Sequence, residues 1–194
     1  MNKRQKILAQ SITMALISAG GAFVSLPCTA WAAEAELNDG TNPTDKGMSI
    51  SNILGDEIHF TASDSGNKLT IAGYSSDTYG VIGGYSNAAG TAASNNSVTM
   101  NSGKVKNILI GGLNSSDNGT ASGNTVTVNG GSINTSNYDL YGISGGIGHT
   151  ANNNTVNVTK NFTGESYYLH GGWGYYDSTA NHNTVKLQGG SFVE

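Results

Sequence analysis

The second half of the chain repeats one pattern of apolar and polar positions. Each copy contains an asparagine, a serine or threonine, a valine, a polar residue and a second apolar residue, with an alanine three positions before the asparagine. Apolar residues at every second position are typical of a β-strand that buries one face. The asparagines are Asn96, Asn124, Asn154 and Asn183, and the valines that follow them are Val98, Val126, Val156 and Val185.

The spacing of the asparagines sets the length of the repeat. Successive copies lie 28, 30 and 29 residues apart, and a weaker copy at Asn67 precedes Asn96 by 29 residues, with Asp64 in place of the alanine. A period of this length indicates a solenoid, a propeller or another array of repeats. A propeller blade needs roughly 40 residues, so a solenoid matches the spacing better.

A pair of glycines recurs in phase with the asparagine pattern. An apolar residue stands two positions before the first glycine of each pair, as at Val81, and a large apolar or aromatic residue stands two positions after it, as at Tyr85. Positions two apart on a strand share a face, so we expect these three residues to be buried on the same side. The pairs are Gly83 and Gly84, Gly111 and Gly112, Gly145 and Gly146, and Gly171 and Gly172.

Two strands per repeat, with the same residue types returning one repeat later, predict an all-β fold. It is a parallel β-solenoid of about four to five coils with a repeat of about 29 residues, in which each strand pairs with its equivalent in the next coil. Equivalent asparagines then stack and hydrogen-bond along the coils. The longer interval between Val126 and Gly145 predicts a bulging surface loop around residues 134–141.

The first residues are typical of an export signal. A basic segment precedes a largely apolar run from Ile7 to Leu26, and the small residues Ala30 and Ala32 follow it. This arrangement predicts a secretory signal peptide cleaved after Ala32, and the polar residues within the run argue against a retained membrane anchor. The only cysteine, Cys28, lies in this segment, which excludes disulfides and cysteine-ligated metals from the mature chain.

The charge of the mature chain disfavours one class of partner, and the positions of the motifs give the expected domain bounds. Cleavage after Ala32 leaves 6 basic and 13 acidic side chains, a net charge of −7, which disfavours nucleic acid. After signal removal, no apolar run is long enough to cross a bilayer as a helix. We expect a signal peptide at 1–32, an N-terminal segment or degenerate cap at 33–58, and solenoid repeats at 59–194 that are truncated at their C-terminus.

Gly-Gly-aromatic segments, such as Gly171-Gly172-Trp173, and Asn-Thr-Val strands ending near glycine, as at residues 124–131, accompany this signal peptide. In these features the chain resembles the passenger region of bacterial autotransporters, the type V secretion family, over roughly residues 66–194. The resemblance implies a β-solenoid that acts in adhesion or biofilm formation and is carried to the cell surface by a C-terminal outer-membrane β-barrel. This sequence has no run of amphipathic strands for such a barrel, so we expect a truncated passenger.

Other motifs are better explained by the repeat. Residues 142–146 match the G-x-S-x-G of serine hydrolases, but Ser144 occupies the slot of Ile110 in another repeat and no helix is predicted after it. The segments after Gly145 and Gly171 lack the aspartate of calcium-binding nonapeptides. We predict no catalytic, cofactor-binding or metal-binding residue and no cofactor, and we expect the histidines at surface or turn positions. These are His59, His149, His170 and His182.

An aromatic cluster near the last glycine pair is the candidate binding surface. By strand alternation Trp173 and Tyr175 share one face, and Tyr176 takes the other. Inward-facing members would fill the core, whereas exposed members would stack on glycans or a host protein. The candidates are Tyr168, Trp173, Tyr175 and Tyr176.

These features predict a non-enzymatic surface or secreted protein that serves as an adhesin, a stalk or a biofilm matrix component. We expect it at the bacterial surface, in the outer membrane or outside the cell, or in the periplasm if no barrel is attached. Its expected partners are host or matrix glycans or proteins, and an open C-terminal coil predicts self-association. The alternative is a solenoid carbohydrate-active enzyme, a lyase or glycosidase, with a site on its loops. A glycosidase needs paired carboxylates, whereas the acids of the repeats are scattered.

Overall fold

The computed structural model describes residues 32–61, 63–134, 142–162, 164–166 and 168–192. The predicted signal peptide, apart from Ala32, and the greater part of the predicted loop, 135–141, lie outside the described residues. The described residues form parallel sheets stacked as a β-solenoid of about four turns with a spacing near 29 residues. The predicted all-β solenoid fold is therefore confirmed.

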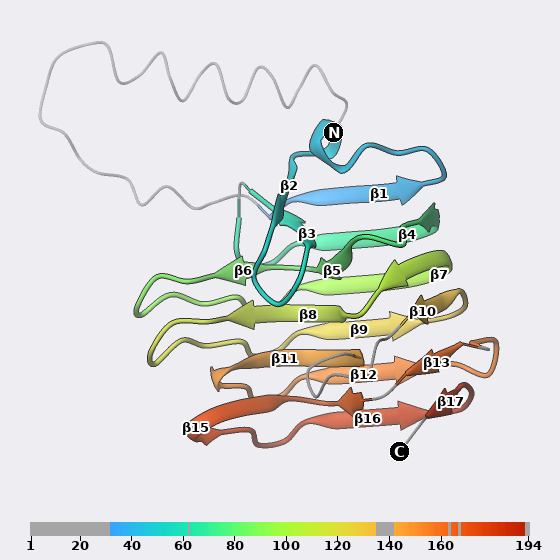
Figure 1. Cartoon of the computed structure of the whole chain (residues 1–194). Coiled ribbons are helices and arrows are strands. Elements are labelled where there is room, and N and C mark those ends of the chain that lie inside the picture. Colours follow the sequence, from blue (N-terminus) through green and yellow to red (C-terminus); the bar gives the residue numbers. More distant parts are fainter. Residues whose placement is uncertain (1–31, 62, 135–141, 163, 167, 193–194) are drawn as a thin grey trace, which may run out of the picture. The chain divides into compact units, whose positions relative to one another are not determined.

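One strand of each coil belongs to a parallel sheet that has seven strands among the described residues. Figure 1 shows the strands of this sheet stacked one above another. The register follows the sequence repeat, because Val126 aligns with Val98 on one side and with Val156 on the other. The order is β1 (Glu34–Asn38), β4 (Lys68–Ser75), β7 (Ser97–Lys106), β9 (Thr125–Val128), β12 (Thr155–Val158) and β16 (Thr184–Leu187), and β10 (Ser132–Asn134) pairs with β7.

The second sheet has eight described strands and is parallel except for one hairpin, β2–β3. Its order is β14 (Tyr168–His170), β11 (Gly142–Thr150), β8 (Leu109–Asn114), β5 (Gly80–Ile82), β3 (Glu57–Phe60) and β2 (Met48–Ser51), with β15 (Trp173–Thr179) beside β11 and β6 (Tyr85–Ser86) beside β8. Two short strands, β13 (Glu165–Ser166) and β17 (Ser191–Phe192), form a third parallel sheet. No helix in the described part of the chain has the length and apolar character needed to cross a bilayer.

The predicted asparagine ladder runs through the solenoid. The Asn124 side-chain oxygen accepts the Asn96 backbone N–H at 2.9 Å and the Asn96 amide at 3.0 Å, and the Asn124 amide donates to the Asn154 side-chain oxygen at 3.1 Å. Asn183 continues the series by accepting from Asn154. Asn67, Asn96, Asn124 and Asn154 are at most 1% exposed. Their buried amides are hydrogen-bonded, which avoids the large penalty for an unsatisfied polar group.

Each glycine pair lies against one asparagine of this ladder. A Cβ atom on Gly112 would lie 2.6 Å from the Asn124 amide nitrogen and would overlap the carbonyl oxygen of Ala93. A Cβ atom on Gly111 would lie 2.9 Å from the Asn124 Cβ atom, so both glycines face the interior. The ladder and the second sheet approach so closely that no side chain fits between them.

Because both glycines face inward, the side chains before and after the pair point to opposite faces of the second sheet. Leu109 precedes the pair and belongs to the main core, together with the valines of the ladder strands. Leu113 follows the pair and belongs instead to a second cluster with Ile82 and Ile110 on the outer face. Tyr85, Ile147 and Trp173, at the positions equivalent to Leu113, pack in the same second cluster. The prediction that the residues on both sides of the pair share one face is therefore wrong.

The N-terminal segment adds a rung and then a short helix and hairpin. β1 pairs with β4 in the register of the repeat, and Asn67 accepts the Ala33 N–H at 2.9 Å. A 3-10 helix, η1 (Pro43–Lys46), leads to the β2–β3 hairpin. Ile58 and Phe60 of β3 lie in the main core, and Met48 of β2 joins them.

Candidate functional site

Four aromatic rings form a continuous row near the last glycine pair. Tyr168 and His170 of β14 stack with ring centroids 5.6 Å apart and an interplanar angle of 14°. His170 stacks on Trp173 of β15 at 6.0 Å and 22°, and Trp173 contacts Tyr175 at 5.8 Å and 52°. All four side chains are half-buried. We call these four residues the aromatic row.

The aromatic row lies on the outer face of the second sheet. His170 aligns with Ser144, which aligns with Ile110, a buried residue of the second cluster on the face of the sheet opposite the main core. Leu169, between Tyr168 and His170, packs against the main core. Because neighbours along a strand point to opposite faces, Tyr168 and His170 point outward.

The structure thus brings together three of the four aromatic residues selected from the sequence: Tyr168, Trp173 and Tyr175. The side chain of Tyr176 lies outside the described part of the chain. His170 was missed, because it was expected at a surface or turn position, whereas it is half-buried in a strand. Its position two residues after Tyr168 is the signal that would have placed it in the row.

Partial burial favours the uncharged forms of His170 and Tyr175. Desolvation lowers the pKa of His170 below its usual value of 6.5. Desolvation also raises the pKa of Tyr175 above its usual value of 10.0, and the neighbouring Tyr85 adds a smaller contribution in the same direction. The imidazole is therefore neutral and the phenol keeps its proton, so the row offers flat, uncharged surfaces and a hydroxyl donor.

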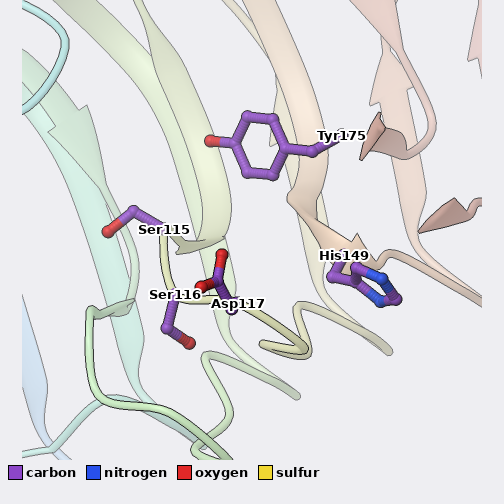
Figure 2. A pocket seen from close by; sticks show the side chains of 5 residues that line it. All are labelled: Ser115, Ser116, Asp117, His149 and Tyr175. Carbon is purple, nitrogen blue, oxygen red and sulfur yellow. The ribbon is translucent and has the colours of Figure 1, made fainter. Parts of the chain in front are cut away.

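A hollow of about 310 Å³ adjoins the Tyr175 end of the row. Ser115, Ser116 and Asp117 line it from the loop after β8, and His149 lines it from β11 (Figure 2). Figure 2 shows the Tyr175 hydroxyl pointing toward Ser115, with Asp117 between Ser116 and His149. This volume is at the lower end of the range of small-molecule sites, about 300 to 1,000 Å³.

Three polar groups of the hollow have no hydrogen-bonding partner among the described residues. These are the Asp117 carboxylate, the His149 ring and the Tyr175 hydroxyl. Ser116 is held in place, since its hydroxyl donates to the Asn114 side-chain oxygen at 2.6 Å. The Ser115 hydroxyl lies 3.2 Å from the Tyr85 hydroxyl. The hollow therefore combines a positioned aromatic ring with a free carboxylate and a free imidazole.

A metal ion is not the natural occupant of this hollow. Only Asp117 and His149 among its lining residues are common metal ligands. Across the described residues, no group of three or more histidine, cysteine, aspartate or glutamate side chains converges. Stable metal sites in proteins use three or more such ligands.

A serine–histidine contact occurs in the N-terminal hairpin and was not foreseen. The Ser51 hydroxyl lies 2.9 Å and the Ser49 hydroxyl 3.3 Å from Nε2 of His59, while Nδ1 of His59 lies 3.0 Å from the Phe60 carbonyl oxygen. His59 is 8% exposed and lies within β3, so the prediction of a surface or turn position is wrong. Ser49 is its direct partner across the hairpin, and we interpret the contact as a brace between β2 and β3.

Ser144 lies in a strand and not at a nucleophile elbow. β11 continues through it to Thr150, and its side chain is 4% exposed. Its hydroxyl donates to the carbonyl oxygen of Gly146 at 3.4 Å. The G-x-S-x-G match is thus a position of the repeat, as the sequence comparison between coils predicts.

No protein-family model, no curated protein and no solved structure matches this chain.

Proposed function

We propose that this chain is an exported, non-enzymatic β-solenoid of the autotransporter passenger type, which serves in adhesion, as a stalk or as a biofilm matrix component at or outside a bacterial cell surface. The observation that carries the proposal is the aromatic row on the outer face of a regular stack of coils. Such a stack holds exposed side chains at constant spacing, which suits the binding of an extended partner.

Export is tested by expressing the full chain in a Gram-negative host beside a variant that lacks residues 2–32. We expect the full chain outside the cytoplasm with Ala33 as its first residue, and the deletion variant in the cytoplasm, because the basic and apolar N-terminal segment directs secretion. Retention of the full chain in the cytoplasm would contradict export. An exported product that begins at Met1 would contradict cleavage after Ala32.

Adhesion is tested by attachment of cells, or of beads coated with the full chain, to glycan-coated and protein-coated surfaces. We expect coating to increase attachment. The control is a chain carrying Asn124→Ala, which removes three hydrogen bonds of the buried ladder and should lower attachment by unfolding the stack. Equal attachment with and without the full chain would refute the adhesive role.

We propose in addition that the outer edge of β16 receives a strand from a second copy of the chain. β16 is the last strand of the first sheet in the described order, and Val185 and Leu187 are 42% and 50% exposed. A strand edge with exposed apolar residues pairs readily with another strand. Light scattering should show a mass that rises with concentration, and Val185→Lys should reduce this rise. A monodisperse monomer at high concentration would contradict the proposal.

A carbohydrate-active enzyme is the second candidate, because the hollow contains the carboxylate of Asp117 and the imidazole of His149. Both groups serve in general acid–base catalysis. A glycosidase needs two carboxyl groups, and Asp117 is the only one among the described lining residues. Release of reducing ends from a polysaccharide by the full chain, abolished by Asp117→Asn, would favour the enzyme over the adhesin.

A further inference from the structure

We propose that the hollow beside Tyr175 binds one pyranose ring of a neutral glycan, and that the aromatic row extends the contact to the adjoining sugar residues. This inference rests on the proposed adhesive function and names the ligand class and the site. The hollow joins residues from three successive coils, since Ser115 to Asp117 follow β8, His149 lies in β11 and Tyr175 lies in β15. Stacking of the coils, and not any contiguous motif, creates it.

The free polar groups match the hydroxyls of a sugar. A carboxylate accepts hydrogen bonds from two neighbouring hydroxyl groups, and the unpartnered Asp117 is available for this. The His149 ring offers one nitrogen donor and one acceptor when neutral. A pyranose ring presents hydroxyls around its edge, so these two side chains and the serine hydroxyls would surround that edge.

The apolar side of the hollow matches the faces of a sugar. Tyr175 is half-buried, and its contact with Trp173 at 5.8 Å fixes the plane of the ring. Binding sites for small ligands generally combine such aromatic walls with a few placed polar groups. The row continues from Trp173 to His170 and Tyr168, so an oligosaccharide would meet more aromatic surface than a single sugar.

The charge of the hollow favours a neutral glycan over an acidic one. Its described lining contains one carboxylate and no lysine or arginine. The whole chain has a formal net charge of −4 at pH 7. A uronic acid or a sulfated sugar would place like charge against Asp117, which disfavours binding.

Saturation-transfer difference NMR on the full chain tests the site. The probes are the methyl glycosides of glucose, galactose, mannose and N-acetylglucosamine, and methyl glucuronide as the acidic counterpart. We expect saturation transfer to at least one neutral glycoside and none to the glucuronide. No transfer to any neutral glycoside at millimolar concentration, or stronger transfer to the glucuronide, would overturn the proposal.

Variants locate the binding to the hollow. Asp117→Ala should weaken the affinity for the bound glycoside by about tenfold or more, as expected for loss of a charged hydrogen-bond acceptor. Asp39→Ala, which removes an exposed aspartate after β1, should leave it unchanged. Tyr175→Phe keeps the ring and should stay within about threefold of the original, whereas Tyr175→Ala should abolish binding. Unchanged affinity in Asp117→Ala would overturn the assignment of the glycan site to the hollow. Asp117 is exposed, so its substitution avoids the folding defect that Tyr175→Ala introduces at a half-buried position.

The outcomes separate this inference from the proposed function. A full chain that promotes attachment but shows no saturation transfer overturns the pyranose site and leaves adhesion standing. A full chain that shows Asp117-dependent saturation transfer but promotes no attachment supports the site and overturns the adhesive role.

Discussion

A central coil and the last described coil carry the same motif in different surroundings. Val126 and Val128 of β9 are fully buried, with strands on both sides. Val185 and Leu187, at the equivalent positions of β16, are 42% and 50% exposed. The motif therefore sets the direction in which a side chain points, whereas the neighbouring coils determine how much of it is buried. Equivalent substitutions in the two coils should therefore lower the free energy of unfolding by different amounts. The difference measures how much the stacking of a further coil contributes to stability.

A substitution in the glycine pair should cause the largest loss of unfolding free energy. In Gly112→Ala the new Cβ atom would overlap the Ala93 carbonyl oxygen and approach the Asn124 amide, both within the stack. We expect a loss on the order of 4 kcal/mol in the free energy of unfolding, because backbone and ladder must separate. Denaturant unfolding followed by circular dichroism measures it.

Gly90→Ala is the matched control for this substitution. Gly90 has a φ of +73° with nothing within 4 Å of an added Cβ atom, so only backbone strain of about 1 kcal/mol is expected. Equal losses in the two variants would mean that the close approach to the ladder contributes nothing to stability.

The ladder asparagines should give the next largest effect. Asn124→Ala leaves the buried Asn96 backbone N–H without its partner, and it removes the bonds of the Asn124 side chain to the Asn96 amide and to the Asn154 side-chain oxygen, which still accepts the Asn124 backbone N–H. We expect a loss of about 3 kcal/mol. Asn183→Ala lies at a less buried position of the last described coil. It should lower the free energy of unfolding by about half as much, because water can take the place of some of the lost hydrogen-bond partners. A larger loss in Asn183→Ala, measured by the same unfolding experiment, would contradict the comparison.

The strands and the ladder were predictable from the sequence, whereas the functional surface was predictable only in part. The alternation of apolar positions and the regular spacing of Asn96, Asn124 and Asn154 predict the fold, because the same motif recurs and each copy supports the assignment of the others. The shift of alternation at the glycine pair was not predictable, since the sequence alone does not show that both Gly111 and Gly112 face the ladder.

The hollow escaped sequence analysis for a related reason. His149 and Tyr175 each stand four residues after the first glycine of their pair, but the residue type at this position differs between coils, and Asp117 lies in the loop after β8, so no motif joins the three. They meet because consecutive coils are stacked. The contact of His59 with Ser51 depends on the antiparallel hairpin, the one departure from parallel pairing among the described strands of the second sheet.

The inward-facing valines should give a smaller effect that sharpens the same comparison. Val126→Ala removes two methyl groups from the core and should lower the free energy of unfolding by about 2 kcal/mol. Val185→Ala should lower it by less than about 1 kcal/mol, since 42% of that side chain is already exposed. Thermal unfolding of the two variants provides the measurement. Equal shifts would show that β16 is as well packed in solution as β9.

The hairpin at the opposite end of the stack should give the smallest effect, visible as a pH dependence. Glu57 is 2% exposed, and its carboxylate accepts the backbone N–H groups of Ile53 at 2.9 Å and Leu54 at 3.1 Å. Desolvation by burial is the main cause that raises the pKa of Glu57 above its usual 4.5; the two hydrogen bonds lower it, and Asp56 adds a smaller upward contribution. The folded chain thus holds this proton more tightly than the unfolded chain. Its contribution to stability is full below about pH 4.5 and is lost as the pH rises through the higher folded-state pKa.

Glu57→Gln keeps one acceptor oxygen and should remove this decline, whereas Glu34→Gln, at an exposed position of β1, should leave it in place. Unfolding midpoints measured from pH 4 to pH 7 test the prediction, and a decline of the same size in Glu57→Gln would show that another group is responsible.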